Sequence, residues 1–141
     1  MKLYIASSWR NTEYDSIVAR LSASHECYDF RHPDGRIPDV RPFSWAAIDP
    51  EWQNWTMAEY RKHLRTHPLA LQAFASDCCA IDDADGVVLV QPCGISAHLE
   101  AALAVGMGKP VVSVGTLREP ELMLAMVDAI LAGDELDLLD D

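Results

Sequence analysis

The sequence lacks several signatures that would identify its chemistry directly. No G-x-G-x-x-G follows the first apolar segment and no G-x-x-x-x-G-K-[ST] occurs, so a dinucleotide-binding fingerprint and a phosphate-binding P-loop are both absent. The four cysteines form no C-x-x-C pair, and cysteines and histidines do not fall at zinc-finger spacing. We therefore expect neither a bound metal nor a cofactor.

Basic residues are scarce and long apolar runs are missing. Lys and Arg number 11 against 22 Asp and Glu, which gives a formal charge of −11. Such a chain has no general attraction to nucleic-acid phosphates or to an anionic membrane surface, so we expect neither as a partner. No apolar run reaches the roughly 20 residues that span a bilayer, and residues 1–6 are too short for a secretory signal. These absences favour a cytoplasmic protein.

The remaining composition is that of one folded domain. The chain has 141 residues, half of them hydrophobic, enough to bury a core within a single domain over residues 1–141. We interpret the cysteines as reduced, buried thiols that act as small hydrophobic side chains. They are Cys27, Cys78, Cys79 and Cys93.

Alternating patterns predict a parallel α/β fold. Apolar segments typical of strands lie at residues 2–7, 26–30, 86–91 and 110–115, with a last short strand expected near residues 129–131. The third and fourth are almost continuously apolar, as in strands buried on both faces. Helical patterns separate these strands. The sequence therefore predicts an open, doubly wound parallel sheet of four or five strands.

Apolar spacings of three and four predict the helices. They cover residues 13–23, 56–66, 68–83, 96–107 and 119–130. Thr12 and Thr56 are the expected caps of the first two. The expected buried stripes are Leu71, Phe74, Ala75, Cys78 and Ile81 on one helix, and Leu122, Met123, Met126, Val127 and Ile130 on another. The acidic residues from Asp134 onward predict a solvated end.

Residues 31–55 form a loop rich in proline and tryptophan. It holds four of the eight prolines and three of the four tryptophans, Trp45, Trp52 and Trp55. Aromatic surface is costly to leave in water, so we expect order here. Two compatible interpretations stay open: a small satellite core under the loop, or an aromatic wall that stacks on a planar ligand.

The candidate functional residues follow from the rule that ligands of such sheets bind at the carboxyl ends of the strands. That rule points to residues 7–11, the segment after Phe30, residues 91–98 and residues 115–120. In the first loop, Ser8 and Arg10 offer a hydroxyl and a guanidinium suited to a single phosphate. The alternative is a surface turn that caps the following helix.

Three further side chains have an unusual placement. Glu100 is the one acid in an apolar helix directly after the central strand, although the helix dipole alone would favour an acid there. Asp77 lies at the edge of an apolar stripe, where a carboxylate needs a hydrogen-bonding partner. His98 precedes Glu100 by two residues and so points to a different face, which gives a metal role little support.

Three short motifs then follow one another along the chain. They are YIASSWR at residues 4–10, Ser76-Asp77 followed by Asp85, and PCGISAHLE at residues 92–100 ending in Gly108-Lys109-Pro110. In this order and spacing the chain resembles the nucleoside 2-deoxyribosyltransferase family, over nearly its whole length apart from the tryptophan-rich loop.

The resemblance implies a flavodoxin-like sheet and a homo-oligomer in which a neighbouring subunit often completes the pocket. It makes Glu100 the nucleophile, Asp77 the residue that contacts the base or delivers its proton, and Tyr4 the residue that positions the glutamate. Gly94 and Ser96 fall at the substrate, where members tend to have an acid and a glycine respectively. A related branch hydrolyses deoxynucleoside monophosphates and holds the 5′-phosphate with residues that match Ser8 and Arg10.

We therefore expect an enzyme that cleaves or transfers at the N-glycosidic bond of deoxynucleosides or their monophosphates. A carboxylate below the sugar carbon would stabilise the positive charge that builds there and trap it covalently. A second base would then give transfer and water would give hydrolysis, and the residues do not decide between them. Two alternatives remain: a nucleotide-binding sensor without turnover, and a module that cleaves the nicotinamide N-glycosidic bond of NAD.

Overall fold

The computed structural model of the chain describes residues 1–139. Its internal contacts divide the chain into two compact units, one of Met1–Asp29 with Ile81–Asp141 and the other of Phe30–Ala80. A single domain over residues 1–141 stays a prediction.

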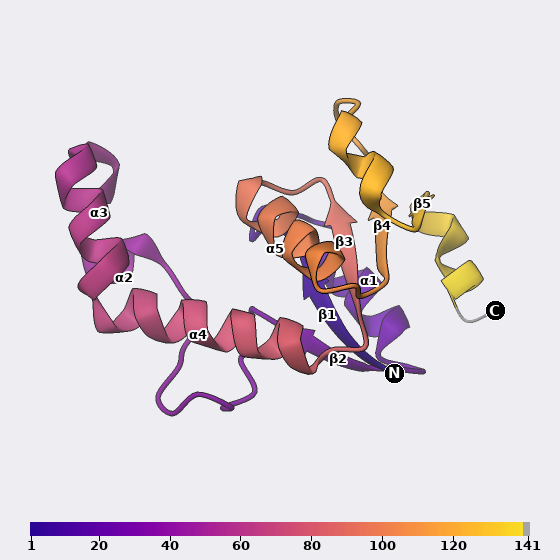
Figure 1. Cartoon of the computed structure of the whole chain (residues 1–141), viewed down its shortest axis with the longest axis horizontal. Coiled ribbons are helices and arrows are strands. Elements are labelled where there is room, and N and C mark those ends of the chain that lie inside the picture. The colour runs from indigo at the N-terminus through magenta and orange to yellow at the C-terminus, as the bar shows by residue number, and fades with distance from the viewer. Residues whose placement is uncertain (140–141) are drawn as a thin grey trace. The chain divides into compact units, whose positions relative to one another are not determined.

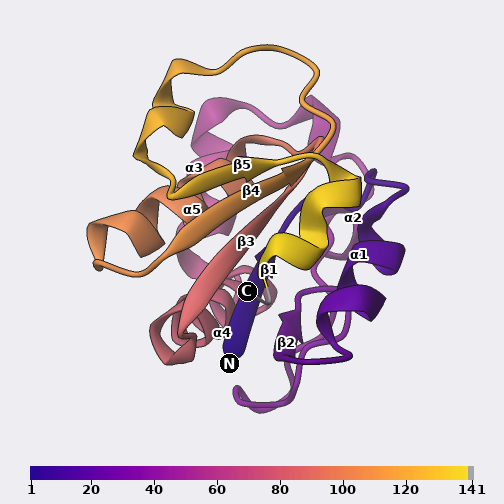
Figure 2. The same ribbon diagram turned by 90° about the vertical axis from the view of Figure 1, so that its right-hand side faces the viewer.

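The first unit is built on a parallel sheet, which confirms the predicted fold class. Within residues 1–139 the sheet has five strands in the order β2-β1-β3-β4-β5, and every neighbouring pair is parallel. The strands are β1 (Lys2–Ala6), β2 (Glu26–Asp29), β3 (Gly86–Gln91), β4 (Val111–Gly115) and β5 (Ala129–Leu131). The chain reverses its direction of travel across the sheet between β1 and β3, which is the switch point where such folds bind ligands (Figures 1 and 2).

The core of this unit lies at the middle of the sheet. β3 is buried along its whole length, as its continuous apolar run predicts. The helix α5 (Ile95–Gly106) packs on β1, β3 and β4 through the small side chains of Ala97, Ala101 and Ala104. Figure 2 shows α5 on one face of the sheet and α1 (Tyr14–Leu21) on the other.

Two predictions for this unit are wrong. Thr12 does not cap α1, because the helix begins at Tyr14 and its N-cap position is Glu13, which makes no side-chain capping hydrogen bond. Asn11 Oδ1 accepts from the backbone N–H of Glu13 at 2.8 Å. The predicted helix over residues 119–130 is only the short 3₁₀ helix η2 (Leu122–Met126), in which Leu124 alone is buried. The chain must already be extended at Ala129 to pair with β4, so too few residues remain for an α-helix. The predicted short strand there is confirmed.

The C-terminal segment is a short helix with one buried leucine and exposed acids. Residues Gly133–Leu139 form the 3₁₀ helix η3, and Leu136 is buried. Arg20 donates to the carbonyl oxygen of Gly133 at 2.7 Å and to the carboxylate of Asp137 at 2.8 Å. The acidic side chains Asp134, Glu135 and Asp137 are exposed, which confirms the predicted solvated acids as far as Leu139, while Asp140 and Asp141 lie outside the described residues.

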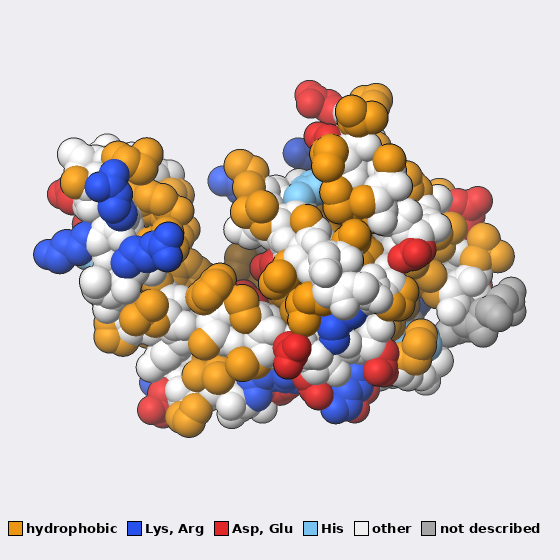
Figure 3. All heavy atoms as spheres, viewed as in Figure 1, with side chains coloured by type: hydrophobic (Ala, Val, Ile, Leu, Met, Phe, Trp, Pro, Cys, Tyr) orange, Lys and Arg blue, Asp and Glu red, His pale blue; other side chains and the backbone are white. Residues whose placement is uncertain are grey.

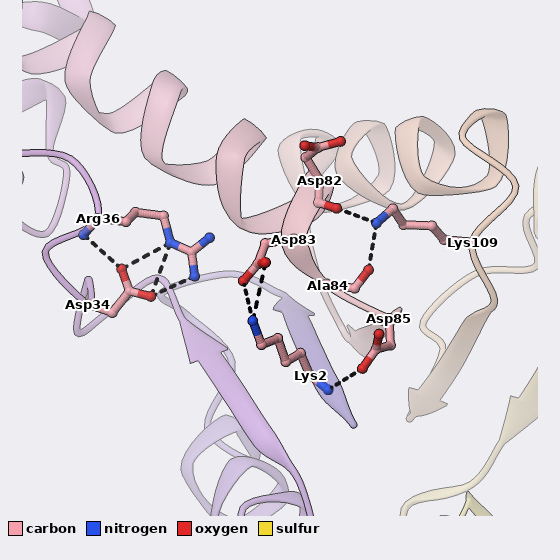
Figure 4. A network of polar contacts seen from close by, with 8 residues as sticks. All are labelled: Lys2, Asp34, Arg36, Asp82, Asp83, Ala84, Asp85 and Lys109. Carbon is pink, nitrogen blue, oxygen red and sulfur yellow. Dashed lines mark hydrogen bonds and ion pairs between the residues drawn. The ribbon is translucent and has the colours of Figure 1, made fainter.

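The opposite end of the sheet is held by lysine contacts (Figure 4). Lys109 Nζ donates to the backbone carbonyl oxygens of Asp82 and Ala84, at 2.6 Å each, and so satisfies carbonyls where α4 ends. Lys2 Nζ pairs with Asp83 at 3.0 Å. Asp85 accepts from the backbone N–H of Lys2 at 2.7 Å, so this carboxylate joins the start of β1 to the start of β3.

The second unit is helical. It contains α2 (Trp45–Ile48), the 3₁₀ helix η1 (Trp52–Asn54), α3 (Met57–Thr66) and most of α4 (Pro68–Asp83). Thr56 caps α3 in a full capping box with Glu59, as predicted. The predicted apolar stripe of α4 is partly wrong. Leu71 and Phe74 are exposed, Phe74 by 70%, because α4 buries its small residues Ala70, Ser76 and Ala80 instead.

The cysteines correct one further expectation. None of the four described cysteines is in a disulfide, but none is fully buried and Cys79 is exposed, so they are not the buried thiols that the sequence predicts. Over residues 1–139, no helix combines the length and apolarity needed to cross a membrane.

Candidate functional site

A cleft of about 790 Å³ lies in the first unit beyond the carboxyl ends of the strands. Three of the four loops that the sequence indicated line it, those after β1, β3 and β4. The lining residues are Ser8, Arg10, Gln91, Pro92, Cys93, Gly94, Ile95, His98, Leu99, Leu117, Arg118, Glu119, Pro120, Glu121 and Met123. The fourth loop, after Phe30, belongs to the second unit.

Buried polar contacts join the loop after β1 to the end of β3. Ser7 Oγ donates to the carbonyl oxygen of Val90 at 2.9 Å. Asn11 Nδ2 lies 3.3 Å from that oxygen and 3.2 Å from the carbonyl oxygen of Pro92. These contacts give hydrogen-bond donors to the carbonyl oxygens of Val90, near the end of β3, and of Pro92, in the loop that follows it. They also fix the loop that presents Ser8 and Arg10 to the cleft. No motif marks Asn11, so sequence reasoning missed it.

One wall of the cleft is a ring of hydrogen bonds. His98 Nδ1 lies 2.8 Å from the carbonyl oxygen of Gly94, which can only accept, so Nδ1 carries the hydrogen. His98 Nε2 then accepts from the amide of Gln91 at 3.3 Å. The Cys93 thiol completes the ring by donating to Gln91 Oε1 at 3.5 Å. The histidine is thus held as a structural partner of Gln91, and no cluster able to hold a metal ion occurs in the part of the chain that the structure describes.

The end of β4 approaches this wall closely. Gly115 has φ +108°, and a Cβ there would lie 2.5 Å from the carbonyl oxygen of Gln91. Only glycine fits this conformation and this separation. The loop after β4 can therefore begin beside Gln91 and supply the opposite side of the cleft.

Glu100 is half-buried on α5, two turns into the segment that follows β3. It is not one of the described lining residues of the cleft, but its charge reaches the wall. Burial and the nearby Glu100 carboxylate raise the pKa of the Cys93 thiol to about 12. A thiol with so high a pKa holds its proton near neutral pH, which makes Cys93 a poor nucleophile.

Tyr4 and Ser96 occupy contrasting positions. Tyr4 is fully buried in β1 and stacks on Tyr28 of β2, with ring centroids 5.3 Å apart. Ser96 is exposed on the first turn of α5. The roles given to both by the resemblance stay predictions.

The remaining predicted residues belong to the second unit. Asp77 is half-buried on α4. Trp45 makes edge contacts with Phe43, Trp55 and Tyr60, with ring centroids 4.7 to 5.8 Å apart. The rings pack on one another, but none of these side chains is fully buried and Tyr60 is exposed, so the satellite core stays a prediction.

The other face of the cluster is also occupied. Trp55 stacks on His63 at 4.5 Å and donates through Nε1 to Asp49 at 2.7 Å, a contact that lowers the pKa of Asp49. Trp52 is half-buried in η1. Stacking of Trp45, Trp52 or Trp55 on a ligand stays a prediction.

Comparison with known proteins adds a likeness in fold. The chain is similar to the solved structure of the 2-deoxyribosyltransferase of the psychrotolerant bacterium Bacillus psychrosaccharolyticus, described as a biocatalyst for nucleoside synthesis. The TM-score is 0.55 and the sequences are 18% identical, over 92% of this chain and 85% of that one. Neither a scan against family models nor a search of curated proteins found a match. The likeness therefore shows a shared fold.

Proposed function

We propose that this protein is an enzyme that cleaves or transfers at the N-glycosidic bond of deoxynucleosides or their monophosphates, with Glu100 as nucleophile. The observation that carries the proposal is the place of Glu100, half-buried on α5, the helix that follows the central strand and also bears the cleft residues Ile95, His98 and Leu99. The likeness in fold to a 2-deoxyribosyltransferase supports the same chemistry.

Cleavage of the N-glycosidic bond through a covalent intermediate needs one carboxylate beneath the sugar. As the bond from the sugar carbon to the base breaks, its electron pair leaves with the base and positive charge builds on the carbon. The Glu100 carboxylate would stabilise that charge and form an ester to the carbon. Attack by a second base would give transfer, and attack by water would give hydrolysis.

The other predicted residues take supporting roles in this proposal. The leaving base needs a proton or a hydrogen bond, which Asp77 would provide. The Tyr4 hydroxyl would hold the rotamer of Glu100, and Gly94 and Ser96 would contact the substrate. Trp45, Trp52 or Trp55 would stack on the base, and Ser8 and Arg10 would hold a 5′-phosphate.

We also propose that the enzyme is a homo-oligomer. Ile95, Leu99 and Leu103, four residues apart on α5, form an apolar stripe exposed by 81%, 65% and 44%. Hydrophobic side chains gather over this helix in Figure 3. A continuous exposed apolar face is typical of an interface, and a second copy would extend the cleft that Ile95 and Leu99 line. We also propose a cytoplasmic location, where the thiols of its cysteines would stay reduced.

Replacement of the proposed nucleophile tests the function. The wild-type protein, Glu100→Ala and a control, Glu26→Gln on the exposed face of β2, are incubated with deoxynucleosides and their monophosphates, with and without a second free base. We expect base release or exchange by the wild type and the control, and a loss of at least about a thousandfold for Glu100→Ala.

Three outcomes would count against an enzyme of this kind. Equal rates for wild type and Glu100→Ala would remove Glu100 from the mechanism. Thermal stabilisation by nucleotides without any base release in long incubations would favour the sensor, and loss of NAD on incubation would favour the NAD-cleaving module.

A further inference from the structure

The first unit carries the whole negative charge of the protein. Its segments hold five basic residues against sixteen acidic ones, a net charge of −11 that equals the charge of the full chain. Three of the five are engaged in the structure: Lys2 with Asp83, Arg20 with Asp137, and Lys109 with two backbone carbonyls. The other two are Arg10 and Arg118.

Arg10 and Arg118 both line the cleft. Neither guanidinium has an ion pair or a hydrogen bond to any of residues 1–139. In a unit with so many carboxylates, arginines left without a carboxylate partner at one cavity are typical of a site kept for an anionic ligand.

The two arginines come from opposite sides of the central loop. Arg10 follows β1 and Arg118 follows β4, and β3 lies between these strands in the sheet. Neighbouring strands are about 4.8 Å apart, so the two loops start about 10 Å apart, a span that two arginine side chains bridge when they converge on one group. The close approach of Gly115 to Gln91 sets where the second loop begins.

We propose that Arg118, which no motif singles out, forms with Arg10 and Ser8 a two-sided site for a phosphoryl group, so that the substrates are nucleoside 5′-monophosphates rather than nucleosides. This inference relies on the proposed function for the nucleoside part of the ligand, and on the cleft alone for its anion. Two guanidinium forks match the two charges and the planar oxygen pairs of a phosphate monoester.

Arg118 is the basic residue that the loop after β4 contributes to the cleft, beside two acids. Glu119 and Glu121 also line the cleft, and Glu121 Oε1 accepts from the backbone N–H of Met123 at 3.0 Å at the start of η2. Without Arg118, the charged groups on this side of the cleft would be carboxylates alone and would repel a dianion. With Arg118, the loop offers the cleft a guanidinium, whose charge-assisted contact is available only to an anionic ligand.

Binding measurements with single-arginine variants test the site. Titration calorimetry compares the wild type, Arg118→Ala, Arg10→Ala and the control Arg20→Ala, which removes the same charge from the same unit outside the cleft. The ligands are a deoxynucleoside monophosphate, the matching deoxynucleoside, deoxyribose 5-phosphate and inorganic phosphate. Circular dichroism verifies that each variant is folded. Glu100→Gln in every background prevents turnover during the titration.

We expect Arg118→Ala and Arg10→Ala each to weaken the monophosphate by about tenfold or more, the loss of one charge-assisted contact, while the nucleoside changes less than twofold. Arg20→Ala should leave every ligand unchanged within about twofold. Binding of deoxyribose 5-phosphate and not of inorganic phosphate would locate the phosphoryl group on the sugar, and binding of both would widen the ligand class to any phosphate.

The inference and the proposed function fail separately. An equal effect of Arg118→Ala on nucleoside and monophosphate, or an effect no larger than that of Arg20→Ala, would overturn the phosphoryl site even if Glu100 proves essential for base release. Selective loss of monophosphate binding without any base release would uphold the site and reject the enzyme.

Discussion

Asn11 donates to the carbonyl oxygen of Pro92 at 3.2 Å and so joins the loop after β1 to the loop after β3. Its Oδ1 accepts from the backbone N–H of Glu13, the residue directly before α1. Asn11 is only 3% exposed. Because both joined loops line the cleft, this contact determines how Ser8 and Arg10 face the segment that leads to Glu100.

Replacement of Asn11 by Ala should destabilise the protein by about 1–3 kcal/mol, because buried carbonyls lose their donor and Glu13 loses its acceptor. Urea unfolding measures the change. The control Asn54→Ala removes one exposed contact to Glu51 and should change stability by less than about 0.5 kcal/mol. Equal stabilities of Asn11→Ala and wild type would show that the loop does not depend on this side chain.

Replacement of Gly115 by Ala should cost about 2 kcal/mol or more of stability, since the new Cβ would need a strained φ and would meet the carbonyl oxygen of Gln91 at 2.5 Å. Gly106→Ala is the matched control, because α5 ends there and a Cβ at this position would meet nothing within 4 Å outside its own helix. That change should be neutral or stabilising by up to about 1 kcal/mol. If both variants unfold at the same urea concentration, β4 does not need glycine at its end.

The Cys93 thiol should react slowly with iodoacetamide at pH 8, because its pKa is raised to about 12 and little thiolate is present. The exposed Cys79 supplies the internal comparison. Mass spectrometry of alkylated peptides over pH 8 to 11 gives both rates. Glu100→Gln should accelerate Cys93 without bringing its pKa to the ordinary value, since burial is the larger cause.

The raised pKa of the Cys93 thiol also makes the stability of the protein depend on pH. The folded protein holds the Cys93 proton that the unfolded chain releases above about pH 9, so stability from this group falls as pH rises from 9.0 toward 12. If Glu100→Gln leaves the alkylation rate of Cys93 unchanged, the Glu100 carboxylate does not affect this thiol, and the case for Glu100 as a group of the site is weaker.

The sheet could be predicted because its signals are local. The continuous apolar runs of β3 and β4 require burial on both faces, and burial on both faces requires parallel neighbours with helical connections. The carboxyl ends of parallel strands share one edge, so the loops that meet at the cleft could also be named in advance.

The errors arose where long-range pairing overrides local spacing. The apolar residues 122–130 have helical spacing, yet the pairing of β5 with β4 holds Ala129–Leu131 extended. In α4, Leu71 and Phe74 fit a helical stripe but are exposed, whereas the helix buries Ile81 of that stripe together with alanine and serine side chains. Neither the strand pairing nor the buried face of α4 can be read from the residues alone, because both depend on which elements pack against them in the folded protein.

The sequence by itself determined the class of fold, the strands that form its centre, and the single acid that follows the central strand, since hydrophobic period and residue type act over a few residues. Only the tertiary structure decided that Asn11 joins two loops, that Gln91, Cys93 and His98 form one wall, and that Arg118 faces the same cleft as Arg10. Those relationships join residues more than 70 positions apart or depend on side-chain direction, and folding alone brings them together.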